Sequence, residues 1–176
     1  MISLFVFDFD KTLIPFDSFR RYVFHWLKYK PLAIIKFLVF RKLRIYDGAK
    51  FKRKIIRSIF KHPKFESINQ KFVESLIPHV NFKIISNQIE NESKTKIILI
   101  LSASPDIYIS EVANAIELVG KGSHFVNNQF FHLYGTGKIE YLKRYYPKER
   151  YRYVYSISDS KSDLDLLKLF ESYTLI

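Results

Sequence analysis

The sequence Phe5-Val6-Phe7-Asp8-Phe9-Asp10-Lys11-Thr12-Leu13 decides the fold. The apolar run over residues 2–7 is typical of a buried strand. It ends in two carboxylates one residue apart, Asp8 and Asp10, which repel each other and are costly to bury. A divalent cation or lysine side chains usually offset such a cost. Ligands of open α/β sheets bind at the carboxyl ends of strands. The stretch therefore indicates a metal-dependent site, although a lone Asp-x-Asp is more often a strand that runs into a polar turn.

The composition narrows the class of protein. With 176 residues, the chain can form one hydrophobic core, or one core plus a small insertion. A hydrophobic content of 48% argues against disorder. The net charge of +12 favours anionic partners, namely phosphate esters, acidic lipid headgroups or nucleic acid. The absence of cysteine excludes disulfides, Cys-based zinc sites and thiol nucleophiles.

The sequence gives no sign of export or of a membrane span. Asp8 and Asp10 interrupt the first apolar run, so we expect no signal peptide. The longest lipophilic stretch, residues 31–40, is too short to cross a bilayer. The histidines show no spacing typical of metal ligands. We expect a cytoplasmic protein.

Hydrophobic periodicity outlines the remaining elements. Helical spacing predicts helices over residues 19–27, 31–43, 50–60, 65–76, 82–92, 107–118, 138–145 and 164–170. Gly120 and Gly122 are expected to close the helix that begins at residue 107. Apolar runs predict strands over residues 2–8, 97–101, 152–157 and 173–176, and a strand or hairpin over 124–132. Strands that alternate with helices predict an α/β fold with a Rossmann-like, doubly wound parallel sheet.

Polar residues follow the predicted strands where each one ends. Besides Asp8 and Asp10, Ser102 ends one strand, Asp159 and Asp163 follow another, and Lys138 begins a helix. Parallel strands bring their carboxyl ends to one edge of the sheet, so these groups can converge. Carboxylates can hold Mg²⁺, which prefers oxygen ligands, while a hydroxyl and an ammonium group can bind phosphate. Lys138 could instead be a solvated helix residue, with Lys121 and Lys143 as rivals for its role, and Asp163 an acid favoured by a helix N-terminus.

The chain resembles the haloacid dehalogenase (HAD) superfamily of phosphatases in four motifs that occur in order. Asp8-Phe9-Asp10-Lys11-Thr12 matches the first motif, Asp-x-Asp-x-Thr, and the strand ending in Ser102 matches the second. Lys138, after Gly135-Thr136-Gly137, matches the third, and Asp159-Ser160-Lys161-Ser162-Asp163 matches the fourth, Asp-Ser-x-x-Asp. The forms that these motifs take resemble those of subfamily IB, the branch that includes phosphoserine phosphatase and phosphatidylglycerophosphatase C.

The resemblance implies a role for each motif residue. Asp8 would be the nucleophile that forms an aspartyl-phosphate, and Asp10 the acid and base. Asp8, Asp159 and the backbone carbonyl of Asp10 would hold Mg²⁺. Ser102 and Lys138 would bind the transferring phosphoryl group. Asp163 would orient Lys138 or a metal-bound water, with Thr12 and Ser160 supporting the site.

The superfamily places a helical cap where this chain has its insertion. The resemblance implies a catalytic core over residues 1–13 and 81–176, and a cap over residues 14–80 that selects the substrate. Between residues 20 and 64 the sequence has fifteen Lys or Arg and one acid, Asp47. Such a run is often only a solvated face. However, the segments 26–40 and 51–60 mix aromatic, aliphatic and basic residues, which is typical of helices at a membrane surface. The protein would then be peripheral on the inner membrane face.

We predict a Mg²⁺-dependent phosphomonoester hydrolase that acts on a small phosphorylated substrate, including a lipid-linked or other anionic phosphate. Alternatives on the same site are a phosphotransferase, and a phosphoserine or sugar-phosphate phosphatase without membrane association. A receiver-type phosphoacceptor domain would lack both the Asp10 acid/base and the cap. A basic membrane- or nucleic-acid-binding module with a vestigial site is disfavoured because every motif residue is present.

Overall fold

The computed structural model describes residues 1–90 and 95–176. The strands are β1 (Ile2–Phe7), β2 (Lys96–Pro105), β3 (Val119–Val126), β4 (Gln129–Phe131), β5 (Tyr151–Ser158) and β6 (Ser172–Leu175). The α-helices are α1 (Ser18–Leu27), α2 (Pro31–Lys42), α3 (Gly48–Ile59), α4 (Phe65–Leu76), α5 (Phe82–Ile89), α6 (Asp106–Ala115), α7 (Thr136–Tyr145) and α8 (Leu164–Leu167). Short 3₁₀ helices span Ile77–His79 and Lys161–Asp163. This succession confirms the predicted α/β fold.

The sheet places β1 near its centre. In the described part of the chain the strand order is β4-β3-β2-β1-β5-β6. Neighbouring strands are parallel, except that β3 and β4 form an antiparallel hairpin. Val6 of β1 pairs with Leu99 of β2 and with Ser156 of β5. The chain that leaves β1 therefore emerges between the carboxyl ends of β2 and β5, which carry Ser102 and Asp159.

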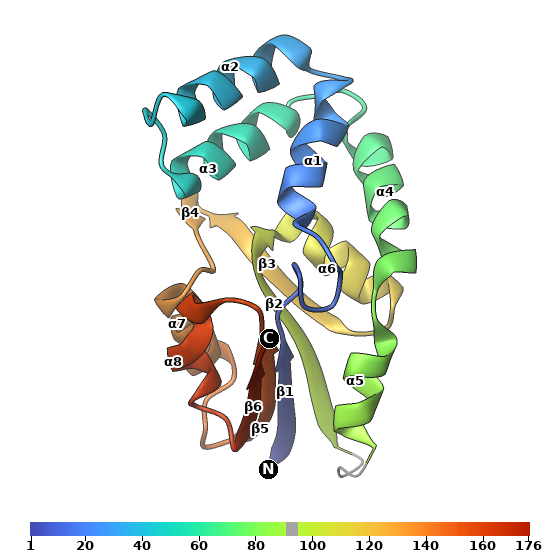
Figure 1. Cartoon of the computed structure of the whole chain (residues 1–176), viewed down its shortest axis with the longest axis vertical. Coiled ribbons are helices and arrows are strands. Elements are labelled where there is room, and N and C mark those ends of the chain that lie inside the picture. Colours follow the sequence, from blue (N-terminus) through green and yellow to red (C-terminus); the bar gives the residue numbers. More distant parts are fainter. Residues whose placement is uncertain (91–94) are drawn as a thin grey trace.

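Both faces of β1 are buried, as expected for a central parallel strand. Leu4 and Val6 belong to one hydrophobic cluster, which includes residues of α7 and α8. Phe5 and Phe7 belong to the other, which includes residues of α6 and of the helices between residues 18 and 76. Figure 1 shows α7 and α8 on one side of the sheet and α5 and α6 on the opposite side. The sheet is doubly wound, as predicted.

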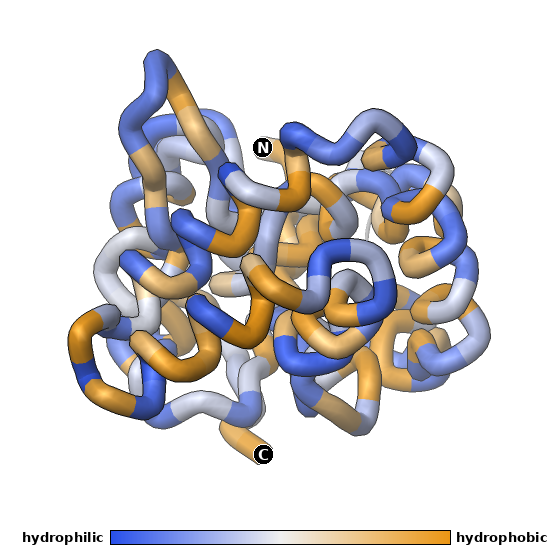
Figure 2. The backbone as a smooth tube through the Cα atoms, turned by 90° about the horizontal axis from the view of Figure 1, so that it is seen from above, coloured by the Kyte–Doolittle hydropathy of each residue, from blue (hydrophilic) through white to orange (hydrophobic). Residues whose placement is uncertain are grey.

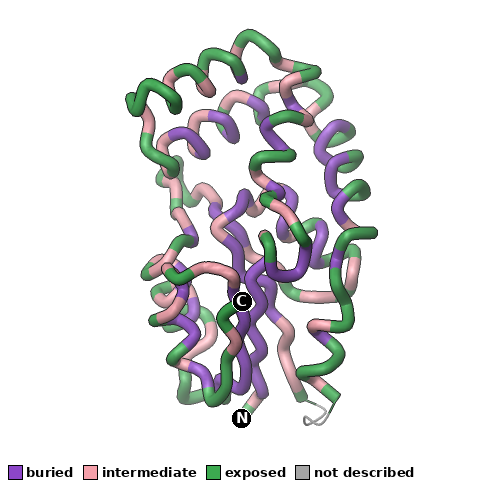
Figure 3. Tube along the Cα trace, in the orientation of Figure 1, coloured by how far each residue is buried: buried purple, intermediate pink, exposed green. Residues whose placement is uncertain are grey.

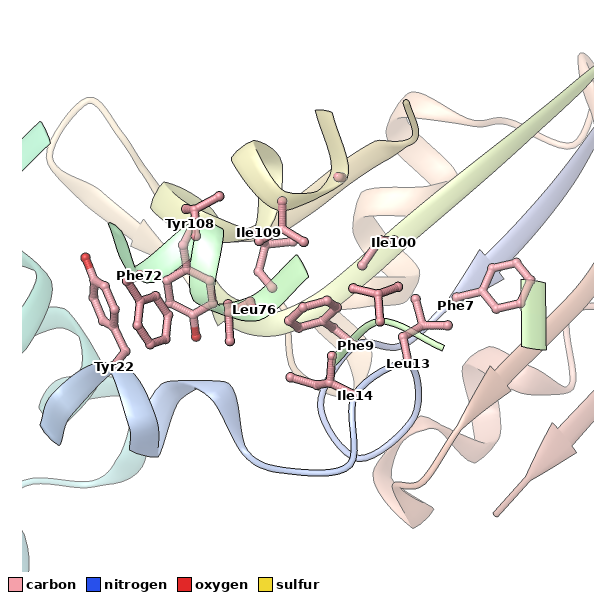
Figure 4. Packing of buried hydrophobic residues seen from close by; sticks show 14 of the residues in the cluster. Phe7, Phe9, Leu13, Ile14, Tyr22, Phe72, Leu76, Ile100, Tyr108 and Ile109 are labelled. Carbon is pink, nitrogen blue, oxygen red and sulfur yellow. The ribbon is translucent and has the colours of Figure 1, made fainter. Parts of the chain in front are cut away.

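Helices α1, α2 and α3 lie beyond the carboxyl ends of the strands (Figure 1). Three aromatic rings join this region to the core: Tyr22 of α1, Phe72 of α4 and Tyr108 of α6 lie with ring centroids 4.8–5.2 Å apart (Figure 4). The hydroxyl of Tyr22 also donates a hydrogen bond to Oδ1 of Asn69, whose amide nitrogen donates to the carbonyl of Ile107. These contacts fix the helices over the end of the sheet. The assignment of residues 14–80 as a cap stays a proposal.

The expectation that Gly120 and Gly122 close a helix is wrong, because both lie in β3. The helix ends at Ala115 instead, and Glu117, with a φ of 59°, takes the left-handed conformation. The glycines permit close packing. A Cβ atom on Gly120 would lie 2.4 Å from Cβ of Ala113, and one on Gly122 would lie 2.4 Å from the carbonyl oxygen of Ser104. Glycine serves both turns and close approach, so the sequence pattern alone did not separate the two.

The other differences concern element ends. Strand β2 runs on to Pro105, so Ser102 lies inside the strand and not in a turn after it. Helix α8 ends at Leu167, three residues earlier than expected. The predicted hairpin over residues 124–132 is confirmed, with Asn127 and Asn128 at positive φ in its turn. The predicted end of the 82–92 helix lies outside the described residues.

Burial follows this architecture. The strands are largely buried, whereas α2, at the end of the molecule away from the sheet, is largely exposed (Figure 3). Figure 2 looks down on that end and shows hydrophobic and hydrophilic residues interleaved along the chain. The helices beyond the sheet have exposed apolar residues, such as Leu32 and Ile35, as well as exposed charged ones, such as Lys36.

Candidate active site

The turn after β1 fixes the two acids of the first motif. The carbonyl of Phe9 accepts hydrogen bonds from the backbone N–H groups of Leu13 and Ile14, at 3.0 and 3.1 Å. Lys11 adopts a φ of 55°, which lets the chain reverse tightly. The N–H of Asp8 donates to the carbonyl of Ile157 on β5, at 3.0 Å. Asp8 is thereby held at the end of the sheet.

A buried lysine joins the first, third and fourth motifs. Nζ of Lys138 lies 2.8 Å from Oδ1 of Asp8 and 2.6 Å from Oδ2 of Asp163. The hydroxyl of Ser158 donates a further hydrogen bond to Oδ2 of Asp163. Asp8 follows β1, Lys138 lies in α7 and Asp163 follows β5, so the fold brings together residues that are far apart in the sequence, such as Asp8 and Lys138, which are 130 positions apart. Lys138 is therefore a buried partner of Asp163 and not the solvated helix residue that the sequence left open, whereas Asp163 does lie at the start of α8, as its alternative interpretation had it.

The rival lysines lie elsewhere. Nζ of Lys121 pairs with Oδ2 of Asp106 at 2.8 Å, at the start of α6. Lys143 is exposed on α7. Neither takes the place of Lys138 beside Asp8.

Burial and the neighbouring charges shift the pKa of the Asp8 carboxyl group and of Lys138. Burial raises the pKa of Asp8 to about 6, although Lys138 opposes the shift. Burial works to lower the pKa of Lys138, but the charges of Asp8 and Asp163 outweigh it and raise that pKa. Lys138 is therefore a permanent cation at neutral pH. It can neutralise a carboxylate or a phosphoryl oxygen.

Asp10 is held in a different environment. Its Oδ1 accepts a hydrogen bond from the backbone N–H of Ser18 at 2.6 Å, and its Oδ2 accepts one from the hydroxyl of Ser104. The hydroxyls of Ser18 and Tyr108 lie 2.9 Å apart and extend this network into the core. Burial raises the pKa of Asp10, while the serine hydrogen bonds oppose the rise. A fixed carboxyl group with a raised pKa is suited to donate and accept protons.

The remaining predicted residues also lie near this end of the sheet. Ser102 and Asp159 line the same cavity as Asp8 and Asp10. Thr12 helps to hold the backbone of Asp159 in place, because its Oγ1 accepts a hydrogen bond from the N–H of Asp159 at 3.1 Å. The other supporting residue, Ser160, lines the cavity and bonds through its hydroxyl to the hydroxyl of Ser162. The structure thus brings together every residue that the motifs singled out.

The cavity has a volume of about 570 Å³ and is roofed by residues that the sequence did not single out. Lys52 of α3 donates from Nζ to the carbonyl of Ala103 at 2.5 Å, and lies 3.4 Å from Nε2 of His132. Burial lowers the pKa of Lys52 to about 8. Burial and the neighbouring charge of Lys52 lower the pKa of His132 to about 4. Within the described residues Lys52 forms no ion pair. The only signal in the sequence was the excess of basic residues over 20–64, which did not distinguish Lys52 from its neighbours.

The cavity suits a hard divalent cation. Asp8 and Asp159 both line it, and oxygen is the donor that Mg²⁺ prefers. Within the described residues, Lys138 contacts one oxygen of Asp8, while the other oxygen and the carboxylate of Asp159 have no hydrogen-bond partner. The described residues contain no cluster of three or more His, Asp or Glu side chains that could hold a metal. A cation here would take its other ligands from backbone oxygens and water, which Mg²⁺ tolerates well.

A model of the haloacid dehalogenase-like hydrolase family matches residues 5–168. The chain belongs to this family. The predicted membership of the superfamily is thus confirmed, and the match covers the helices beyond the sheet and all or part of every strand of the described sheet except β6. No curated protein matches the sequence.

Solved structures show the same fold at low sequence identity. A protein with unknown function from Bordetella pertussis Tohama I has a TM-score of 0.76 at 12% identity, over 99% of this chain and 90% of that one. A phosphoserine phosphohydrolase-like protein from Francisella tularensis has a TM-score of 0.59 at 15% identity, over 99% and 87%. A phosphoserine phosphatase solved as an analogue of its phospho-aspartyl intermediate has a TM-score of 0.55 at 14% identity, over 99% and 86%.

Proposed function

We propose that this protein is a phosphomonoester hydrolase that acts through an aspartyl-phosphate on Asp8. The observation that carries the proposal is the position of Lys138, buried between Asp8 and Asp163 at the cavity that Ser102 and Asp159 also line. A carboxylate nucleophile needs a cation beside it to approach an anionic phosphate, and phosphoryl transfer depends mainly on such positioning and charge neutralisation. The family membership and the fold shared with phosphoserine phosphatase support this reaction.

In the first step, a carboxylate oxygen of Asp8 attacks phosphorus while the bond from phosphorus to the leaving oxygen breaks. Asp10 donates its proton to that oxygen, so the product leaves as an alcohol. In the second step, a water molecule attacks phosphorus, and the bond to Asp8 breaks. Asp10 takes the proton from the water, which restores both acids and releases inorganic phosphate.

The other residues bind and orient the phosphoryl group. Lys138 and the hydroxyl of Ser102 would hold its oxygens, and Asp163 keeps Lys138 in place through the 2.6 Å contact. A Mg²⁺ ion held by Asp8, Asp159 and the carbonyl of Asp10 would supply further charge neutralisation when bound. Thr12 would keep Asp159 in position through the hydrogen bond that its Oγ1 accepts.

We propose that the substrate is a small anionic phosphomonoester, a class that includes lipid-linked phosphates. Lys52 reaches over the cavity from α3 with no ion pair among the described residues, and Arg20 and Arg41 also line the cavity. These cations favour a leaving group with a second negative charge close to the reacting phosphate. A panel of phosphomonoesters with and without a second anionic group tests this preference.

The nucleophile is tested with Asp8→Asn, assayed with an aryl phosphate. We expect turnover to fall by at least about three orders of magnitude, because an amide cannot form the intermediate. Asp165→Asn, a change of the same kind on an exposed acid of α8, serves as the matched control and should leave turnover unchanged. Full turnover by Asp8→Asn would overturn the mechanism. Preferential transfer to an added alcohol over water would assign a phosphotransferase instead.

A further inference from the structure

Helix α2 has an apolar inner face. Ile34 is fully buried, and Phe37 and Leu38 pack partly buried against the main hydrophobic cluster. A surface helix of a globular protein normally carries polar residues on the opposite side. In α2 the opposite side is apolar as well.

The outer side of α2 carries aliphatic residues three or four positions apart, which places them in one stripe along the helix. The members of this outer stripe are Leu32, Ile35 and Val39 of the helix and Leu43 directly after it, which are exposed to 85%, 50%, 47% and 63%. The helix lies at the end of the molecule farthest from the sheet (Figure 1), where most of its residues are exposed (Figure 3). Within the described residues, nothing covers the outer stripe.

Exposed lysines flank the outer stripe on the same helix. Lys36 and Lys42 are exposed on the same helix, and the sequence from residue 20 to residue 64 contains fifteen Lys or Arg against the single acid Asp47. Helix α3 shares the charge but not the apolar surface, because Phe51 and Ile55 are buried. The aliphatic stripe and the positive charge therefore coincide at α2.

The positive charge continues beside α2 into a groove of about 1330 Å³ between α2, α3 and the β3–β4 hairpin. The cations that line the groove are Lys30, Lys36, Lys54, Arg57 and Lys61. Among the described residues its one acid is Asp106, which is already engaged by Nζ of Lys121 at 2.8 Å and by the N–H of Gly122. The groove thus offers positive charge to an external anion next to the aliphatic stripe.

We propose that the outer face of α2 is a docking surface for an anionic lipid membrane. The outer stripe would enter the boundary between headgroups and acyl chains, and the flanking lysines would contact acidic headgroups. None of the described helices is long and apolar enough to cross a bilayer, so the contact would be peripheral. The inference does not depend on the proposed function, because membrane binding is measured without substrate.

Charge and apolar surface favour a membrane over two other partners, namely a second copy of the chain and a nucleic acid. A second copy of the chain would bring the same excess of Lys and Arg to the contact, and like charges repel. A nucleic acid would satisfy the lysines but would leave the aliphatic stripe in water. An anionic membrane satisfies both features at once.

The docking surface lies next to the active site. Leu38 and Arg41, on the inner side of α2, line the cavity that contains Asp8. An α-helix with its side chains is about 10–12 Å across, so a membrane on the outer face would lie about one helix diameter from the cavity wall. A phosphate presented at a membrane surface would thus be close to the nucleophile.

Vesicle sedimentation tests the proposal with the full chain. Vesicles of phosphatidylglycerol and phosphatidylcholine should bind the protein, vesicles of phosphatidylcholine alone should not, and added salt should weaken binding. The double variant Leu32→Ser with Ile35→Ser should reduce partitioning at least about tenfold, because full burial of even one such side chain is worth roughly a tenfold change in an equilibrium constant. Its activity on a water-soluble aryl phosphate should stay unchanged.

The matched control is Phe82→Ser with Ile176→Ser, which removes two exposed apolar side chains outside α2, 51% and 58% exposed. It should bind vesicles as the unmodified protein does. Equal loss of binding in both double variants, no loss in the α2 variant, or equal binding to neutral and anionic vesicles would each overturn the proposal. Self-association that disappears in the α2 variant would assign the stripe to a second copy instead.

Discussion

Replacing Lys138 by methionine tests how the active site balances its buried charges. Lys138 is 2% exposed, and its Nζ contacts both Asp8 and Asp163, at 2.8 and 2.6 Å. Methionine keeps most of the apolar stem and removes the charge. Removal of one partner from a buried ion pair typically costs about 3–5 kcal/mol, because the remaining charge is left unpaired.

The pH dependence of this cost can be worked out from Asp8. Its pKa is raised from the ordinary value of 3.8 to about 6, so its contribution to stability falls as pH rises from about 4 to about 6. Without Lys138 the pKa of Asp8 rises further, and the fall in stability continues above pH 6. A buried carboxylate that has lost its ion-pair partner can avoid the cost of an unpaired charge by taking up a proton. At 1.36 kcal/mol per pH unit above 3.8, that protonation costs about 5 kcal/mol near pH 7.5, which is about 2 kcal/mol more than Asp8 already costs in the unmodified protein, and the lost pairing with Asp163 adds to this difference. Near pH 5 Asp8 is largely protonated in both proteins, so its share of the difference is close to zero.

The assay is urea unfolding of Lys138→Met and the unmodified protein, in metal-free buffer at both pH values. We expect a loss of about 3–5 kcal/mol near pH 7.5 that shrinks to below about 2 kcal/mol near pH 5. Lys143→Met, on the exposed side of the same helix, controls for the substitution itself and should stay within about 0.5 kcal/mol. A loss that is equal at both pH values would show that packing, not unpaired charge, governs the site, and the reasoning would then be refuted.

Two further predictions concern the proposed metal ion and Lys52, which lies over the cavity. Treatment with EDTA should reduce phosphatase activity to below about a tenth, and Mg²⁺ should restore it, because the carboxylates of Asp8 and Asp159 would otherwise repel the substrate; full activity in EDTA would exclude the metal site. Burial lowers the pKa of Lys52 to about 8, so its positive charge is lost as pH rises through 8. The KM for a substrate with a second anionic group should therefore rise about tenfold between pH 7 and pH 9, as a monovalent group titrates. That rise should be absent in Lys52→Met and present in Lys50→Met, a control on the same helix; the same rise in Lys52→Met would contradict a contact between Lys52 and the substrate.

The order and type of most elements follow from local patterns. The apolar run before Asp8 and the run before Ser102 are continuous, so each predicts a strand covered on both faces. Helical spacing likewise predicts α1 to α4 within one or two residues of their observed ends. The glycines of β3 are the exception. Gly120 and Gly122 are needed because β3 packs closely against α6 and β2. The residues that neighbour each glycine in the sequence do not show this close approach.

The sequence by itself predicted which polar residues would meet, because Asp8, Ser102 and Asp159 were expected at the ends of strands and parallel strands end at one edge of the sheet. Only the tertiary structure decided which lysine lies beside Asp8, since Lys138, Lys121 and Lys143 all lie in plausible positions along the chain. Of the fifteen basic residues between residues 20 and 64, the tertiary structure also buried Lys52 at the cavity, and it left the outer side of α2 exposed to solvent. The physical reason is the same in each case. Burial and pairing depend on what the rest of the chain packs against a residue, and neighbouring residues in the sequence do not contain that information.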